Sequence, residues 1–538
     1  MKPIRIALAQ FDFPAGAVEQ NAEQILQLAV RARDELGARL ILFPELAISG
    51  YLAEDLFLRP SFVETCNREL ARVIASLRGI DVVIGHPLRE GEQLFNALSW
   101  VRDGRVIVRY RKQALPNYTV FDEKRYFMAG DQAAIVELDG VRFAPLICED
   151  IWEAFPAARA IQAGADALLV INASPFDIGN RRHRHAEVRE RATTHNVPIA
   201  YVNVVAGQDD LVFDGGAFCV NGDGSMQGPA PAFEDHLLAI DYVPESRRFH
   251  AINWPVAEAD DRARFYKALV RGTRDYIEKN HFPGVLLGLS GGVDSALTLA
   301  IAVDALGPTR VTAVMMPTRF TSQLSLDEAA AQAKLLGVHY HVVPIEDAFS
   351  TLLASLAPIF GERPVDVTEE NLQARIRGMI LMALSNKFGA MVLSTGNKSE
   401  MACGYATLYG DMCGGFAPLK DVYKTEVWAL CRHRNAISPA IPEAVITRPP
   451  SAELRENQKD QDSLPPYELL DEILKRYIEQ DKSRAEIIAE GFDQATVQRV
   501  VKLVLRNEYK RRQSAPGPRI TRRAFGRDRR YPITTGWR

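Results

Sequence analysis

Short apolar runs and longer helical segments alternate along the first half of the chain. Runs rich in Val, Ile, Leu and Ala, each bounded by Gly, Pro or charged residues, predict strands. These strands cover residues 2–10, 38–44, 81–85, 95–101, 105–110, 134–138, 141–147, 167–172 and 199–205. Apolar residues at helical spacing predict helices over 21–36 and 181–193. This order suggests two stacked sheets flanked by helices.

The second half has the regular strand–helix alternation of a doubly wound α/β domain. Strands are predicted over 285–289, 310–316, 338–343 and 390–394, with helices over 260–280, 296–306, 325–336 and 370–388. Residues 221–260 are rich in Gly and Pro, which suits a last hairpin followed by a linker. A chain of 538 residues is too long to fold around a single hydrophobic core. We therefore expect two domains, 1–250 and 251–538.

Composition and charge exclude several classes of protein. No apolar run is long enough to span a bilayer, so no membrane partner is expected. The six cysteines include no C-x-x-C pair, which favours free thiols in a reducing, cytoplasmic setting. The net charge of −4 gives no global case for nucleic acid. His183 and His185 point to different faces of a helix, so we expect no protein-ligated structural metal there.

The last residues, 506–538, are strongly basic. Such a tail is compatible with RNA binding, with a phosphate-rich small-molecule site or with a solvated surface. Pro516, Pro518 and the aromatics between the charges favour a structured loop over a mobile arm.

The stretch from Val285 to Leu297 carries the clearest chemical signal. An apolar strand is followed by the small residues Ser290-Gly-Gly and then by a helix that begins near Asp294. Backbone N–H groups at such a turn favour an anion, and a carboxylate at Asp294 suits phosphate that carries Mg²⁺. No G-x-x-x-x-G-K-S/T pattern is present, so this is not a Walker loop. The alternative is an ordinary glycine turn.

The six residues Ser-Gly-Gly-Val-Asp-Ser (290–295) resemble the pyrophosphate loop of the ATP pyrophosphatase superfamily. Members of that superfamily form an adenylate and expel pyrophosphate. Ligands bind at the carboxyl ends of strands in such sheets. The site is therefore expected to gather residues 290–295, 317–321 and 395–400.

Glu45, Lys112 and Cys148 each follow a predicted strand in the first half. A thiol attacks an amide as thiolate, so it needs a base, and an ammonium group stabilises the oxyanion that forms. A lone cysteine at a strand end is more often inert core. The motifs Phe43-Pro-Glu45, Tyr110-Arg-Lys112 and Leu146-Ile-Cys-Glu-Asp150 nevertheless resemble, in order, those of the nitrilase superfamily, whose triad is Glu, Lys and Cys.

The resemblance narrows to the glutaminase version of that fold. Residues 115–127 and 172–176 are similar to segments in which, by the resemblance, Tyr118 and Ser174 contact glutamine. Asn180 stands where this resemblance implies a lysine near the glutamine, and Arg181 and Arg182 are the candidate substitutes.

Motifs of the second half resemble the NAD synthetases. They are residues 368–377, 394–400, 409–411, 415–421, 451–454, Asp460, 463–467 and 508–512. Together the two halves are similar to the glutamine-dependent NAD synthetases. This implies an N-terminal nitrilase-type α-β-β-α sandwich and a C-terminal doubly wound parallel sheet, of the adenine nucleotide alpha hydrolase type. The implied reaction is amidation of deamido-NAD by glutamine-derived ammonia, driven by ATP, and two sites in one chain suggest a protected ammonia route.

The same resemblance implies the site residues. For ATP they are Gly288, Leu289, Ser290, Gly291, Gly292, Val293, Asp294, Ser295 and Thr395. Asn371, Glu400 and Lys510 are expected to bind deamido-NAD, and Asp294 and Glu400 to hold Mg²⁺. Thr395 and Asn371 as helix caps and Lys510 as a solvated charge are the alternatives. The substrates are L-glutamine, ATP and deamido-NAD, with no organic prosthetic group, and at least a dimer through the C-terminal domain is expected.

Two other functions share parts of this pattern. GMP synthesis or tRNA thiolation would keep the pyrophosphate loop and change the acceptor. However, thiolation often needs cysteine pairs, absent here, and GMP synthetases usually carry a different glutaminase. An RNA-binding tail on an inert scaffold is the third possibility, and an intact set of Glu45, Lys112 and Cys148 speaks against inertness.

Overall fold

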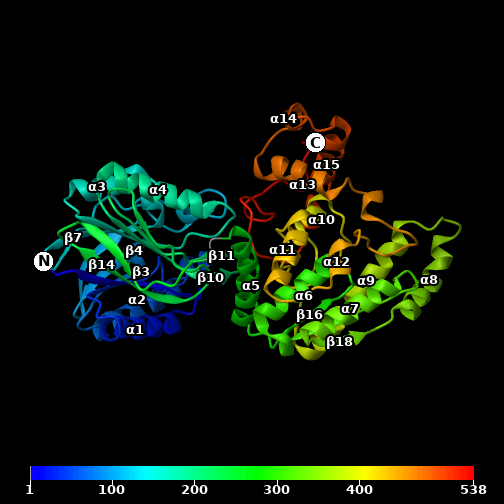
Figure 1. The fold of residues 1–538 in the computed structure, drawn as a ribbon, viewed down its shortest axis with the longest axis horizontal. Coiled ribbons are helices and arrows are strands. Elements are labelled where there is room, and N and C mark those ends of the chain that lie inside the picture. Colours follow the sequence, from blue (N-terminus) through cyan, green and yellow to red (C-terminus); the bar gives the residue numbers. More distant parts are fainter. Residues whose placement is uncertain (1, 258–259, 538) are drawn as a thin grey trace. The chain divides into compact units, whose positions relative to one another are not determined.

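The computed structural model describes residues 2–257 and 260–537, and the chain divides into two compact units, Met1–Asp261 and Arg262–Arg538 (Figure 1). The expected domain boundary near residue 250 falls inside strand β15 (Arg248–Ile252). Within the Gly- and Pro-rich segment 221–260, β14 (His236–Val243) and β15 form the predicted hairpin, which extends the first sheet beside β1. Residues 258–259 of the predicted linker lie outside the described residues.

The first unit contains a seven-stranded sheet in the order β15-β14-β1-β2-β3-β4-β5. Its other strands are β1 (Ile4–Gln10), β2 (Leu40–Leu42), β3 (Asp81–Glu90), β4 (Gln93–Arg102) and β5 (Arg105–Arg111). Along β1 the side chains alternate: Ile6 and Leu8 enter one apolar core, while Ala7 and Ala9 enter another. The second of these cores packs against α1 (Val18–Asp34) and α2 (Pro60–Ser76).

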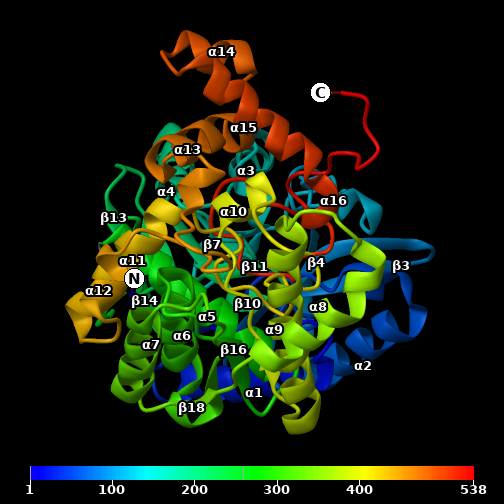
Figure 2. The ribbon, with the colours of Figure 1, turned by 90° about the vertical axis from the view of Figure 1, so that its right-hand side faces the viewer.

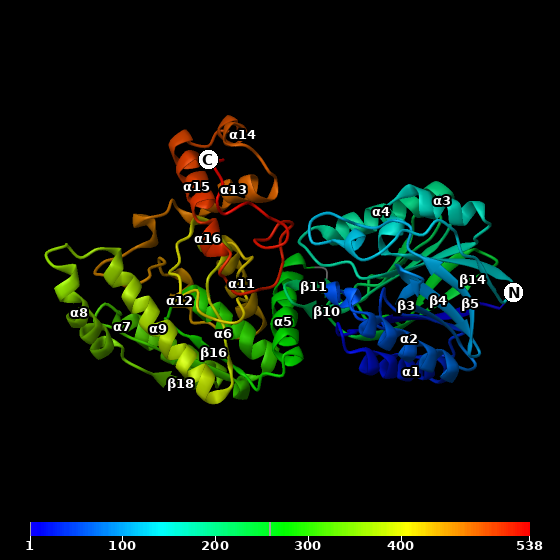
Figure 3. The same cartoon turned by 180° about the vertical axis from the view of Figure 1, so that it is seen from behind.

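A six-stranded sheet, in the order β13-β12-β9-β8-β7-β6, faces the first one across the core that holds Ile6 and Leu8. Its strands are β6 (Val136–Leu138), β7 (Val141–Ile147), β8 (Ala167–Asn172), β9 (Ile199–Asn203), β12 (Phe218–Val220) and β13 (Met226–Gln227). Helices α3 (Ala154–Gln162) and α4 (Asn180–His195) cover its outer face (Figure 3). A small ribbon of β10 (Val205–Gln208) and β11 (Leu211–Asp214) completes the unit. The predicted α-β-β-α sandwich is confirmed.

The second unit is built on a parallel sheet in the order β18-β17-β16-β19. The strands are β16 (Val285–Gly288), β17 (Val311–Met315), β18 (His339–Val342) and β19 (Met391–Val392). Val285 and Leu287 pack with α5 (Asp261–Lys279), α6 (Val293–Leu306) and α7 (Gln323–Leu336). Leu286 points to the other face, where α8 (Glu346–Phe360) and α9 (Val367–Phe388) lie (Figure 2). Helices on both faces confirm the doubly wound architecture.

The last strand of this sheet is shorter than predicted. Ser394 N–H donates to Phe416 O, so the chain leaves the sheet after Leu393 and pairs with a later loop. The remaining chain forms a helical layer with its own apolar core. Its helices are α10 (Lys398–Cys403), α11 (Lys424–Ile437), α12 (Glu443–Thr447), α13 (Tyr467–Leu474), α14 (Arg484–Ala489), α15 (Gln494–Arg506) and α16 (Glu508–Arg511). Among residues 2–257 and 260–537, no helix is both long and apolar enough to cross a membrane.

Candidate active site

The chain leaves β7 at Ile147 and turns abruptly at Cys148, where φ is +46°. A residue with a Cβ is uncommon in that conformation, and such turns occur preferentially at functional sites. The Asp150 carboxylate stabilises the turn by accepting the Ile147 N–H at 3.1 Å. It also accepts the N–H groups of Gln113 and Ala114, at 2.9 and 2.8 Å. One buried carboxylate thus joins the cysteine turn to the segment that follows Lys112.

Lys112 and Glu45 form an ion pair whose side chains are both 0% exposed. Lys112 Nζ lies 2.7 Å from Glu45 Oε1, and the same oxygen accepts Asn96 Nδ2 at 2.7 Å. Ala173 N–H donates to the other oxygen, Oε2, at 3.0 Å. A buried ion pair needs such additional hydrogen bonds to offset the loss of water. Glu45 is therefore fixed on both oxygens.

Glu123, which the sequence analysis did not single out, completes this cluster. Its Oε1 lies 2.9 Å from Lys112 Nζ and accepts the Tyr51 hydroxyl at 3.0 Å. Burial, opposed by Lys112 and reinforced by the charge of Glu45, raises the pKa of Glu123 to about 7. Burial alone would lower the pKa of Lys112, but the charges of Glu123 and Glu45 outweigh it and raise that pKa well above its usual range. Lys112 is therefore a permanent cation between two carboxylates.

Cys148 lies within the electrostatic field of this cluster. Burial, and then the charge of Glu45, raise the pKa of the Cys148 thiol well above its usual range, against the attraction of Lys112. The resting thiol consequently keeps its proton until a base removes it. The structure brings the three predicted residues together: Lys112 and Glu45 are in direct contact, and the charges of both act on the Cys148 thiol.

The other residues predicted in this unit have partners of their own. The Tyr118 hydroxyl donates to the Glu149 carboxylate at 2.9 Å, and Ser174 is buried beside Asn203. Asn180 Nδ2 donates to Pro175 O at 2.8 Å. Arg182, one of the candidate substitutes for the implied lysine, is 80% exposed at its side chain.

The loop after β16 in the second unit is closed by its own serines. Ser295 Oγ donates to Gly292 O at 3.0 Å and accepts the Ser290 N–H at 3.3 Å. Gly291 has φ +78°, and a Cβ there would lie 2.5 Å from Ser325 O. Only glycine fits this turn, which leads directly into the N-terminus of α6.

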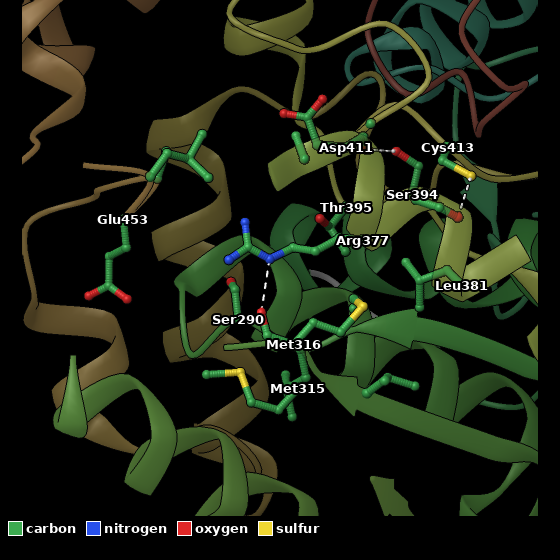
Figure 4. Close-up of a pocket in the computed structure, with 18 of the residues that line it drawn as sticks. Ser290, Met315, Met316, Arg377, Leu381, Ser394, Thr395, Asp411, Cys413 and Glu453 are labelled. Carbon is green, nitrogen blue, oxygen red and sulfur yellow. Dashed lines mark hydrogen bonds between the residues drawn. The ribbon is translucent and has the colours of Figure 1, made fainter. Parts of the chain in front are cut away.

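Two cavities lie beside this loop and share Ser290 and Thr395. The first, of about 230 Å³, includes in its lining apolar side chains of β17 and α9. Figure 4 shows Ser290, Thr395 and Arg377 around this space, with Met315 and Met316 beside them. Arg377 Nε donates to Met316 O at 3.0 Å. From the predicted segment 317–321, Thr321 is part of this lining.

The second cavity, of about 160 Å³, has several charged side chains in its lining, among them the predicted metal ligands Asp294 and Glu400. Lys424, at the start of α11, pairs with Asp294 and lies 3.4 Å from Glu400 Oε1. Asn397 Nδ2 donates to Asp294 Oδ1 at 2.9 Å. Burial, followed by the charge of Asp294, raises the pKa of Glu400 to about 8. Lys424 is a second residue that the sequence analysis missed, because it lies just beyond the quoted motif 415–421 and carries no signal of its own.

The two remaining predicted residues hold a loop at the edge of this cavity. The Thr407 hydroxyl donates to Asn371 Oδ1 at 2.8 Å, and Lys510 Nζ donates to Gly404 O and Ala406 O, both at 2.8 Å. Burial lowers the pKa of Lys510. Ala406 lines the cavity, whereas Asn371 and Lys510 do not. The two side chains therefore support the wall of the cavity through their hydrogen bonds to this loop.

The basic tail is folded onto the second unit. Glu508 is paired with Arg511 at 2.8 Å and with Arg529 at 2.7 Å. Arg519 is paired with Asp528 at 2.6 Å, and both side chains are buried. Compensated, buried arginines indicate a structural role for much of this charge, in agreement with the predicted structured loop.

The comparisons agree with this division of the chain. The carbon–nitrogen hydrolase family matches residues 5–248, and the NAD synthase family matches residues 265–514. The glutamine-dependent NAD(+) synthetase of Xanthomonas campestris pv. campestris (strain 8004) is 55% identical over 541 residues, which cover 99% of this chain and 98% of that protein. That of Acinetobacter baylyi is 50% identical, over 100% of this chain and 99% of that protein.

A solved structure gives the same result. The glutamine-dependent NAD+ synthetase from Acinetobacter baumannii, in complex with ADP, is 47% identical with a TM-score of 0.81. The match covers 100% of this chain and 99% of that one. At this identity and coverage, the chain belongs to the family of glutamine-dependent NAD(+) synthetases.

Proposed function

We propose that this protein makes NAD⁺ from deamido-NAD, ATP and L-glutamine, and releases AMP, diphosphate and L-glutamate. The observation that supports it best is the buried cluster of Lys112, Glu45 and Glu123 beside Cys148, since that set of groups is suited to opening a carboxamide. Family membership and the loop of residues 290–295 support the second half of the reaction.

In the first unit, Glu45 takes the proton of the Cys148 thiol, and the thiolate attacks the glutamine carboxamide. The fixed charge of Lys112 stabilises the oxyanion. Glu45 passes this proton to the amide nitrogen as the C–N bond breaks, and ammonia leaves. Glu45 then takes a proton from water, which cleaves the glutamyl thioester, and the Cys148 thiol regains its proton. Tyr118, Ser174 and Asn180 hold the glutamine. Glu149 accepts a hydrogen bond from Tyr118 and faces the same substrate.

In the second unit, residues Gly288 to Ser295 and Thr395 bind ATP. The nicotinate carboxylate of deamido-NAD attacks the α-phosphorus, diphosphate leaves, and ammonia displaces AMP from the acyl adenylate. Asn371, Glu400 and Lys510 orient deamido-NAD. Lys424 supplies a positive charge at the same cavity.

Asp294 and Glu400 fit a magnesium site of the kind completed by phosphate oxygens, because both carboxylates line the cavity at the phosphate loop. Among the described residues no group of three His, Cys, Asp or Glu side chains could hold a metal by itself. A bound Mg²⁺ would offset the charge of departing diphosphate.

We further propose a cytoplasmic homo-oligomer formed through the second unit. One side of α9 exposes Met379 and Met382, one turn apart, at 61 and 40% of their surface. Apolar side chains grouped in this way are typical of protein interfaces. Sedimentation of the purified protein would test this, and a monomer at micromolar concentration would contradict it.

The function is tested by mass balance on the purified protein. Equal amounts of glutamate, AMP, diphosphate and NAD⁺ are expected from glutamine, ATP and deamido-NAD. Glutamate release without NAD⁺ formation, under saturating ATP and deamido-NAD, would contradict the proposed acceptor. Adenylate formation with xanthosine monophosphate in its place would favour GMP synthesis.

A further inference from the structure

The basic run at the start of α4 contains one arginine that differs from its neighbours. Arg184 has only 1% of its side chain exposed, whereas Arg182 has 80%. Its guanidinium lies 3.0 Å from Asp214, at the end of β11, and the Asp214 side chain is 2% exposed. Burying an ion pair costs free energy of desolvation, which good geometry and additional hydrogen bonds must offset. The groups around Arg184 therefore indicate its role.

The positive end of this pair points at Ser174. Arg184 Nη2 lies 3.4 Å from both the hydroxyl and the carbonyl oxygen of Ser174, while Nη1 binds Asp214. Within residues 2–257 and 260–537, the buried Nε of Arg184 has no hydrogen-bond partner. The guanidinium therefore keeps donor capacity on the side away from Asp214.

Ser174 is held from a second side by Asn203. Ser174 N–H donates to Asn203 Oδ1 at 2.8 Å, and Asn203 Nδ2 donates to Ser174 O at 3.1 Å. The preceding residue, Ala173, donates its N–H to Glu45 Oε2. The segment that presents the Ser174 hydroxyl thus lies between the base Glu45 and a buried cation.

We propose that Arg184 is the specificity-determining positioning residue of the amide pocket, and that it makes the pocket select an amide with a carboxylate at its far end. This inference rests on the proposed glutamine hydrolysis at Cys148. A hydroxyl alone distinguishes a carboxylate poorly from a neutral group, because it both donates and accepts. A buried guanidinium behind the hydroxyl turns the Ser174 proton toward the substrate and favours negative charge there, where little water screens it.

The test compares L-glutamine with 4-aminobutanamide, which is the same molecule without its carboxylate. The Arg184→Met variant is expected to raise the KM for glutamine at least tenfold, while kcat/KM for 4-aminobutanamide stays within twofold of the unchanged protein. Arg184→Lys keeps the positive charge but loses the two-pronged guanidinium. Its KM for glutamine is expected to lie between those of the unchanged protein and of Arg184→Met. The matched control is Arg189→Met, since Arg189 is exposed on the same helix and should leave both substrates unaffected.

Synthesis of NAD⁺ from added ammonium reports whether the second unit of each variant is folded, and hydrolysis of 4-aminobutanamide reports the same for the first unit, which carries Arg184. Equal losses for the two amides, or an unchanged KM for glutamine, would overturn the inference. If Arg184→Met loses the ammonium reaction, the test rests on Arg184→Lys. A higher KM for glutamine with an unchanged kcat/KM for 4-aminobutanamide would support the inference, and any other result would overturn it. Failure of the unsubstituted protein to hydrolyse glutamine would instead refute the proposed function.

Discussion

Glu123 offers the sharpest test of the amide-cleaving cluster, because a single substitution removes its charge and keeps its shape. In Glu123→Gln an amide oxygen can still accept from Lys112 Nζ and from the Tyr51 hydroxyl, which lie 2.9 and 3.0 Å from the present carboxylate. What disappears is one of the two negative charges that hold Lys112 beside Cys148.

The expected loss follows from the strength of that contact. A hydrogen bond to a charged group contributes about 1.5–3 kcal/mol, and a neutral one about 1 kcal/mol. If the difference of about 0.5–2 kcal/mol is realised in the transition state, kcat for glutamine hydrolysis falls roughly 2- to 30-fold. Ammonium-driven synthesis should not change.

The pH dependence provides an independent readout. Burial first, and the charge of Glu45 in addition, raise the pKa of Glu123 to about 7, so this carboxyl loses its proton near neutrality. If its charge supports catalysis, glutamate release rises through about pH 7, and Glu123→Gln abolishes that rise. Because a raised carboxyl pKa stabilises the folded state only at acid pH, the variant should also lose less stability than the wild type as pH rises from the ordinary value of 4.5 to about 7.

Steady-state glutamate release from about pH 5.5 to about pH 8.5, at saturating glutamine, measures both the loss of kcat and its pH dependence. Glu92→Gln, at an exposed position in the turn between β3 and β4, is the control. A Glu123→Gln protein with the wild-type rate and the same rise near pH 7 would refute the reasoning, since Lys112 would then need no second carboxylate.

Three further outcomes are expected. Cys148→Ala should abolish NAD⁺ formation from glutamine and spare it from ammonium, whereas Asp294→Ala should abolish both, as product assays with each nitrogen source would show. Gly291→Ala should weaken ATP binding at least tenfold by calorimetry, because a Cβ would lie 2.5 Å from a backbone oxygen at φ +78°, and unchanged affinity would mean that the loop takes another conformation. Glu508→Gln should lower stability by about 3 kcal/mol, as buried arginines lose their partner, and an unchanged melting temperature would show that the tail contributes little to the fold.

The sequence determined the features that depend on neighbouring residues. Short apolar runs such as 141–147 and 167–172 favour buried strands, and both form strands that are buried except at Arg142. The Ser-Gly-Gly turn before α6 was equally predictable, since Gly291 allows a backbone conformation that other residues resist. Strand ends also located Glu45, Lys112 and Cys148, which follow β2 and β5 of the seven-stranded sheet and β7 of the six-stranded sheet.

Tertiary structure alone decided which charged residues belong to the sites. Glu123, Arg184 and Lys424 stand in polar or helical surroundings that resemble any solvated surface in sequence. They become buried only when segments distant in the chain pack over them, as Lys112 does for Glu123 and Asp214 for Arg184. Periodicity and turn chemistry are local properties, whereas the burial of a charge and the choice of its partner depend on the packing of the whole unit.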